Sequence, residues 1–325
     1  MLDIVGQRFW FFFISLLIIV PGAISLAIPP ALKQGIEFTS GSTLTIRFEK
    51  QASQEEVRQA FAALGHGDAI IQHSGQGDFL VRTRTLRPEE KDAQGNVTRA
   101  AERLEIEKAL TERLGPLTVL AFDSVSPIVA EEIVRNAALA VAAATVGILL
   151  YITWAFRKVP NPFRFGTCAV IALVHDVLVV LGVFSIMGKV FNTEVDAMFI
   201  TGLLTVIGFS VHDTIVVFDR IRENIRKNPG VDLEPVVNSS LLETLGRSLN
   251  TSLTLLFVLG ALILFGGVTI RNFLLVLLIG TVSGTYSSIF NASLLLVVWE
   301  KGEMSTLHRR LPRFRALLGG RLRAR

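Results

Sequence analysis

The chain has 325 residues, of which 50% are hydrophobic and 18% charged, and its mean hydropathy is +0.52. This balance is too apolar for a soluble domain and is typical of an integral membrane protein. The single cysteine, Cys168, excludes an intrachain disulfide and a site built from several thiolates. The net charge of +4 does not call for an acidic partner, because the basic residues gather beside apolar segments.

Six apolar segments are each long enough to cross the roughly 30 Å hydrocarbon core of a bilayer as a helix. The first has no small-x-small cleavage pattern after it, so we expect it to be retained as an anchor. Clusters of Lys and Arg follow the second, fourth and sixth segments, and the positive-inside rule therefore predicts both termini in the cytoplasm. The segments are residues 9–28, 137–156, 165–187, 197–218, 249–268 and 273–299.

Residues 35–127, after the first segment, have more charges and shorter apolar runs, which predicts a small folded domain outside the membrane. Leu44, Ile46 and Phe48 alternate with polar residues as in a half-buried strand. Ser53 and Glu56 form a capping-box pattern at the start of a helix. With strands expected at 69–72, 79–83 and 117–122 and a second helix ending at Gly115, the order is β-α-β-β-α-β.

That order is the ferredoxin-like arrangement, with two helices on one face of an antiparallel sheet. The expected fold is therefore a membrane α-helical bundle of six transmembrane helices with an extracytoplasmic α+β ferredoxin-like domain. The predicted divisions are a first transmembrane helix (1–30), the extracytoplasmic domain (31–130), a five-helix transmembrane region (131–300) and a basic cytoplasmic tail (301–325).

Asp213 lies inside the apolar part of the fourth segment. A carboxylate at the middle of a membrane helix costs about 2.5 to 3.5 kcal/mol on insertion scales, which makes it a functional candidate. The fifth segment has a polar stripe at Arg247, Asn250, Thr251 and Thr254. Because these offsets share one helix face and unsatisfied polar groups avoid lipid, we expect the stripe to face the bundle, with Arg247 near the depth of Asp213.

Two hypotheses explain these residues. In the first, Asp213 alternates between a neutral state and an ionised state paired with Arg247, and a proton moving inward supplies about 2.3 kcal/mol per 100 mV of potential. In the second, the two form a static ion pair that fixes helix register. His212 could share the proton, but an offset of one residue turns it toward another helix.

His175 and Asp176 form a polar pair near the middle of the third segment. Histidine titrates near neutral pH, so the pair could relay protons. Adjacent residues on a helix point about 100° apart, so each could equally make a separate structural contact. The sequence leaves both interpretations open.

The chain resembles the SecF family of protein-export membrane proteins, in the resistance-nodulation-division superfamily. The resemblance covers the whole chain and depends most on LLTVIGFSVHDTIVVFDRIREN at 203–224 and TLGRSLNTS at 244–252, supported by His175-Asp176 and GIEFTSG at 35–41. Glu37 and Ser40 stand where the family usually has Asp and Gly, and His212 stands where Asn is common.

The resemblance implies a non-enzymatic subunit that pairs with SecD in the bacterial inner membrane and assists the SecYEG channel, with SecA and YajC as further partners. It implies that the proton is the coupling ion and that no cofactor is bound. Asp213 matches the family's proton-carrying aspartate, and Arg247 its functionally required arginine. The extracytoplasmic domain is expected to meet preproteins, and no nucleic acid is expected as a partner.

Two other functions are open to a chain of this kind. One is half of a proton-coupled exporter of lipids or small molecules, which should have a larger outer domain than the roughly 90 residues available here. The other is a passive assembly scaffold, for which reversing both charges of Asp213 and Arg247 would restore function.

Overall fold

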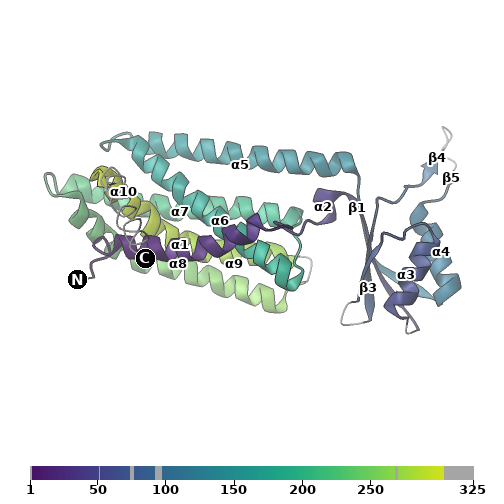
Figure 1. The fold of residues 1–325 in the computed structure, drawn as a ribbon. Coiled ribbons are helices and arrows are strands. Elements are labelled where there is room, and N and C mark those ends of the chain that lie inside the picture. Colours follow the sequence, from purple (N-terminus) through teal and green to yellow (C-terminus); the bar gives the residue numbers. More distant parts are fainter. Residues whose placement is uncertain (1, 51, 74–76, 92–96, 268–269, 304–325) are drawn as a thin grey trace, which may run out of the picture. The chain divides into compact units, whose positions relative to one another are not determined.

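The structure, a computed structural model, describes residues 2–50, 52–73, 77–91, 97–267 and 270–303. The chain forms two compact units, Gln34–Ala138 and the stretches before and after it (Figure 1). The predicted basic tail after residue 303 lies outside the described residues.

The outer unit is a four-stranded antiparallel sheet in the order β2-β3-β1-β6, with helices α3 and α4 on one face (Figure 1). This order confirms the predicted ferredoxin-like fold. A two-stranded hairpin of β4 and β5 is an addition that the sequence pattern did not reveal. The elements are α2 (Ile36–Thr39), β1 (Gly41–Phe48), α3 (Gln54–Ala63), β2 (Ile70–His73), β3 (Asp78–Thr83), β4 (Glu90–Lys91), β5 (Val97–Arg99), α4 (Glu102–Leu114) and β6 (Leu117–Val125).

The alternation seen in the sequence of β1 places its apolar side chains in the core of the outer unit. Leu44 and Ile46 are fully buried, and Leu44 pairs with Val81 on one side and Phe122 on the other. The capping box forms as expected, with the Ser53 hydroxyl accepting from the Glu56 N–H at 3.2 Å and the Glu56 carboxylate accepting from the Ser53 N–H at 2.8 Å. In β1 and at the start of α3, local sequence and tertiary burial therefore agree.

The residues just before β1 have a constrained backbone. Ser40 has φ 60° and ψ 168°, in a region that glycine normally occupies. Gly41 has φ 130°, and a Cβ added to it would lie 2.8 Å from the Thr83 carbonyl oxygen. Glycine at 41 is therefore required by both conformation and space, whereas Ser40 keeps a strained conformation.

Six helices, among the described residues, are long and apolar enough to cross a membrane, as the sequence predicted. The chain is therefore a multi-pass membrane protein. Five spans are single helices, and the last runs from α9 through a π-helical segment, η2, into α10. The bounds are α1 (Arg8–Ala27), α5 (Pro127–Ala155), α6 (Pro162–Phe191), α7 (Ala197–Lys227), α8 (Leu233–Phe265), α9 (Arg271–Tyr286), η2 (Ser287–Ala292) and α10 (Ser293–Glu300).

Most of these helices extend beyond the apolar runs, because polar residues provide their ends. Pro162 occupies the first turn of α6, where its missing N–H costs nothing. Asp196 caps α7 by accepting from the Phe199 N–H at 2.7 Å. α8 begins at Leu233, well before the fifth apolar segment at 249–268, and the residues before that segment are continuous with its span.

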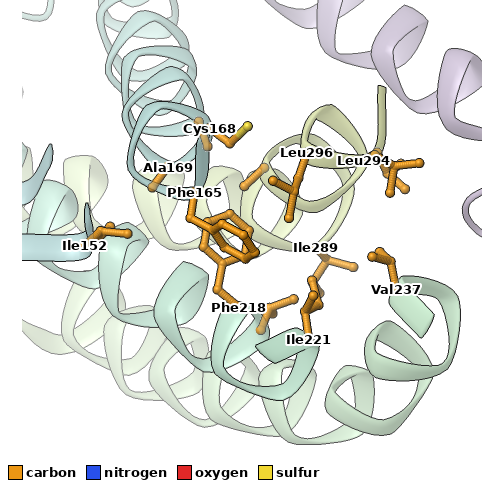
Figure 2. Packing of buried hydrophobic residues seen from close by; sticks show 14 of the residues in the cluster. Ile152, Phe165, Cys168, Ala169, Phe218, Ile221, Val237, Ile289, Leu294 and Leu296 are labelled. Carbon is orange, nitrogen blue, oxygen red and sulfur yellow. The ribbon is translucent and has the colours of Figure 1, made fainter. Parts of the chain in front are cut away.

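One end of the bundle is held by an apolar cluster to which five of the six spans contribute (Figure 2). Phe165 on α6 stacks on Phe156 at 5.3 Å between ring centroids, and its edge meets Phe218 on α7 at 5.2 Å. Ile152, Val237 and Leu296 bring in α5, α8 and α10. Because lipid tails are as apolar as these side chains, close packing, rather than exclusion from water, holds this cluster together.

Candidate functional site

Asp213 lies on α7 and faces a cavity of about 420 Å³ between α7, α8 and α9. Its side chain is 20% exposed. The nearest charged partner given by the structure is the exposed side chain of His212, with Nδ1 3.6 Å from Asp213 Oδ1. The residues around the cavity are Phe209, Ser210, His212, Asp213, Thr251, Ser252, Thr254, Leu255, Val258, Gly280, Thr281, Gly284 and Thr285.

Arg247 is exposed, and the ion pair expected between it and Asp213 is not formed. Across the described residues, Arg247 has no carboxylate oxygen within 4.0 Å. Asn250 is also exposed, whereas Thr251 and Thr254 reach the cavity that Asp213 faces. The expected stripe is therefore divided: its later half meets the aspartate site, and Arg247 does not.

A second polar stripe of α8 faces the bundle instead, at Ser240, Thr244, Ser248 and Ser252, all of them buried. Ser252 Oγ lies 2.5 Å from Thr285 Oγ1 on α9, and Ser240 Oγ accepts from the Asn224 side chain at 3.0 Å. These positions repeat every four residues, a signal present in the sequence. Ser248 and Ser252 are turned about 100° from Arg247 and Thr251, because each directly follows one of those two residues.

Asp176, on α6, is the best-connected polar residue of the bundle, and it is only 1% exposed. Its Oδ2 accepts hydrogen bonds from Ser210 on α7 at 2.6 Å and from Ser287 on η2 at 2.7 Å. Its Oδ1 accepts from Ser283 on α9 at 2.6 Å. One carboxylate thus joins three spans, a role that the sequence could not supply because the serines lie far along the chain.

His175 also contacts this carboxylate, although the two residues are adjacent on one helix. Its Nδ1 lies 3.0 Å from Asp176 Oδ1, and its ring stacks on Tyr286 at 6.4 Å between centroids. The Nε2 atom is buried, and the structure gives it no hydrogen-bond partner. Separate partners were one of the two interpretations of this pair. Asp176 does have partners of its own in the three serines, but His175 also contacts Asp176 directly.

Small residues on α9 allow α7 to approach this polar centre closely. A Cβ added to Gly280 would lie 2.1 Å from Val206 Cγ2, and one added to Gly284 would lie 3.2 Å from Ser210 Cβ. The Gly-x-x-x-Gly spacing therefore does what it does in other membrane helices, bringing two backbones together. Ser210 can reach Asp176 because nothing larger than hydrogen stands at Gly284.

Taken together, the bundle holds two carboxylates in different settings. Asp213 faces a cavity that has threonines among its lining residues, and Asp176 is buried among serine donors. Ser210 belongs to both settings, since it lines the cavity and donates to Asp176. Ionisable residues within a membrane bundle are the usual parts of a proton pathway.

Comparisons with known proteins identify the family of the chain. The family signature "Protein export membrane protein SecD/SecF, C-terminal" matches residues 105–302, and the "SecD/SecF GG Motif" matches residues 30–52. The second signature covers the constrained turn at Ser40 and Gly41.

Similar proteins and structures cover nearly all of the chain. The protein translocase subunit SecF of Thermobaculum terrenum is 51% identical over 322 residues, which cover 95% of this chain and 98% of that protein. The SecF subunit of Anaerolinea thermophila is 44% identical, covering 93% of this chain and 96% of that protein. The crystal structure of SecDF, a translocon-associated membrane protein from Thermus thermophilus, is 33% identical with a TM-score of 0.74, covering 92% of this chain and 39% of that longer one.

A family signature over more than half of the chain, and relatives at 44% and 51% identity along almost their whole length, leave one assignment. The chain belongs to the SecF family of protein translocase subunits.

Proposed function

We propose that the chain is the SecF subunit of the Sec protein-export machinery, and that with a separate SecD chain it uses the proton motive force to assist preprotein translocation through SecYEG. Its relatives support this, since the SecF subunits it resembles have nearly the same length. The SecDF chain of known structure is much longer, and this chain corresponds to 39% of it. A second subunit is therefore the natural source of the missing part.

The protein lies in the bacterial inner membrane with both termini in the cytoplasm, according to the positive-inside pattern. SecA and YajC are further partners in the membrane assembly, and the extracytoplasmic domain meets the preprotein. The chain is not an enzyme, binds neither a cofactor nor nucleic acid, and takes the proton as its coupling ion. These statements extend the family assignment and are part of the proposal.

The observation that carries the coupling role is the position of Asp213 on a cavity inside the bundle. A carboxylate that faces a cavity can exchange a proton through it, whereas one sealed completely among packed side chains cannot. A neutral Asp213 suits the apolar walls around it, and an ionised one attracts a cation. Arg247, exposed and without an ion pair among the described residues, is the cation that an altered helix packing would bring to it.

Substitution of Asp213 by asparagine tests this, because the side chain keeps its size and loses its charge. We expect Asp213→Asn to abolish the part of preprotein export in inverted membrane vesicles that a proton ionophore abolishes in the wild type. Copurification with SecD should persist. Asp219→Asn is the matched control, since Asp219 lies on the same helix, is exposed, and pairs only locally with Arg222.

Ionophore-sensitive export at the wild-type rate by Asp213→Asn would refute the proton-carrying role. Restored export after reversing both charges, at Asp213 and Arg247, would favour the passive scaffold instead. An unchanged rate in the Asp219→Asn control is needed to attribute the loss to the cavity.

A further inference from the structure

We propose that His175 and Asp176 form a second proton-binding site in the bundle, separate from Asp213, with His175 Nε2 as the atom that takes up the proton. This inference rests on the proposed proton-coupled function and deepens it by adding a site next to the cavity. It is carried by four observations on the contacts of Asp176 and His175.

The first observation is that Asp176 accepts hydrogen bonds on both oxygens. Three serine hydroxyls lie at 2.6 to 2.7 Å from it, and His175 Nδ1 lies at 3.0 Å. A protonated carboxyl group could donate to only one of these four, so at least three must donate to it. Serine-to-carboxylate distances in this range are those of O–H···O⁻ hydrogen bonds. The contacts therefore supply enough donors to hold an ionised carboxylate.

The second observation concerns the charge that this leaves in the middle of the bundle. Asp176 is 1% exposed, and an unpaired buried charge is strongly unfavourable. Within the described chain, no Lys or Arg nitrogen lies within 4.0 Å of it, and His175 is the ionisable partner that does. A proton on His175 neutralises this charge without removing any hydrogen bond that Asp176 accepts.

The third observation is the unpartnered nitrogen of His175. With Nδ1 donating to Asp176, the neutral ring carries a lone pair on Nε2, and that atom is buried with no hydrogen-bond partner. A carboxylate on one ring nitrogen fixes the tautomer and favours protonation of the other, as in carboxylate–histidine pairs elsewhere. One proton added to Nε2 takes the pair from a net charge of −1 to neutral, with no bond broken.

The fourth observation is the link to the aspartate cavity. Ser210 lines that cavity and donates to Asp176, so one hydroxyl separates the two sites. The other ionisable groups that face this centre are Tyr286 on the last span, whose ring stacks on His175, and Asp213 with His212 on α7. The Tyr286 hydroxyl donates to the Phe11 carbonyl at 2.7 Å, so its proton is already engaged.

Binding of a proton at this site would weaken the hydrogen bonds that join α6 to α7 and to the last span. Asp176 binds serines of α7, α9 and η2, and each of these is a charge-assisted hydrogen bond while the pair carries a negative charge. A proton on His175 draws the carboxylate charge toward the imidazolium and weakens the three serine bonds together. Two of those serines lie at the junction of α9 with η2, and such π-helical segments often mark functional positions.

The direct test is nitrogen NMR of histidine-labelled full-length chain assembled with SecD in lipid nanodiscs, recorded from about pH 5 to about pH 8, the range in which histidine titrates. We expect the His175 Nε2 signal to shift from the unprotonated to the protonated position as the pH falls, while Nδ1 stays protonated throughout. The exposed His212 provides an internal reference signal in the same spectra. A His175 ring that keeps one protonation state over this range overturns the proposal.

The functional test uses His175→Asn, because the asparagine amide nitrogen can occupy the place of Nδ1 and keep the bond to Asp176 while Nε2 is lost. We expect loss of the histidine-dependent step in the pH profile of ionophore-sensitive export, with SecD assembly unchanged. A wild-type pH profile in this variant also overturns the proposal. A merely structural His175 would leave that profile in place, because the hydrogen bond survives.

The two proposals fail separately. If export with Asp213→Asn is normal, the proposed function is wrong, yet the His175 spectrum still reports whether Nε2 binds a proton. If Asp213→Asn abolishes ionophore-sensitive export and the spectrum shows no titration, the second site alone is wrong.

Discussion

Ser210 on α7 donates its hydroxyl to Asp176 on α6 at 2.6 Å, three residues before Asp213 on the same helix. Positions three apart on a helix share a face, so Asp213 and the serine that holds Asp176 lie on the same side of α7. A movement of α7 that repositions Asp213 must therefore stretch or break the contact with Asp176. This shared face links the cavity to the buried polar centre mechanically.

The first prediction concerns Arg247, which makes no ion pair with a described residue in this structure. Because the side chain is exposed and has no carboxylate within 4.0 Å in the described chain, we expect Arg247→Ala to change thermal stability by no more than about 0.5 kcal/mol. Ionophore-sensitive export should nevertheless be lost, since the cation that Asp213 would meet in its other state is gone. Thermal unfolding of the complex with SecD and vesicle export measure the two effects.

Arg247→Lys is the matched variant for this experiment, because it keeps the positive charge and loses only the planar guanidinium. It should retain more export than Arg247→Ala. A large loss of thermal stability in Arg247→Ala would mean that the arginine holds the resting structure together, contrary to its exposed position.

Ser40 offers a prediction about stability in the outer unit. Its φ of 60° and ψ of 168° are nearly exclusive to glycine, and such strain costs about 1 to 3 kcal/mol. Because glycine loses more entropy on folding than serine, we expect Ser40→Gly to stabilise the unit by a net value of about 1 kcal/mol. Hydrogen exchange of the β1 and β6 amides in the full-length chain measures this.

The neighbouring position gives the opposite result and serves as control. Gly41→Ala places a Cβ 2.8 Å from the Thr83 carbonyl oxygen at a φ of 130°, so β1 must shift and exchange must quicken. If Ser40→Gly also quickened exchange, the strain at Ser40 would not be the limiting feature of this turn.

Glu102 makes the stability of the outer unit depend on pH. The Arg87 backbone N–H donates to its Oε2 at 2.8 Å, and this bond, aided by nearby His66, lowers the pKa of Glu102 below its usual value. A lowered pKa in the folded state stabilises the fold above the unfolded pKa of about 4.3, and the stabilisation is lost as the pH falls through the folded value. We expect the outer unit to weaken progressively below about pH 4.3.

Glu102→Gln should remove this pH-dependent part and cost about 1 kcal/mol at neutral pH, because the amide oxygen still accepts from Arg87 but carries no charge. Hydrogen exchange of α3 and α4 in the full-length chain at several pH values measures it. Glu105→Gln is the control on the same helix, since its carboxylate meets only the Arg87 side chain and is half-exposed. Equal pH profiles in the wild type and Glu102→Gln would contradict the prediction.

The sequence predicted the fold because the fold depends on local patterns. Six apolar runs of sufficient length each became a membrane-spanning helix, and the alternation at Leu44, Ile46 and Phe48 became a central strand. The β4–β5 hairpin escaped prediction because its strands are only two and three residues long. Periodicity cannot be recognised over so few positions.

The candidate site was predictable in its residue types but not in its connections. Asp213 became a candidate only because a carboxylate in an apolar membrane segment is energetically costly. Thr251 and Thr254 line the cavity that it faces. The face of α8 was assigned incorrectly for Arg247, because this helix has polar residues on two faces and a 3.6-residue period does not say which one is buried. Ser248 and Ser252 are the buried ones.

By itself, then, the amino-acid order determined the number of membrane crossings, the topology of the outer sheet and the two acidic positions that cannot be ordinary lipid-facing residues, since these follow from hydrophobicity summed over neighbouring residues. Only the tertiary structure decided that Asp176 gathers Ser210, Ser283 and Ser287 from three other segments, and that Arg247 stays apart from Asp213. The reason is geometric. The direction in which each helix turns its polar face depends on how all the helices pack together, through close approaches such as Gly280 against Val206.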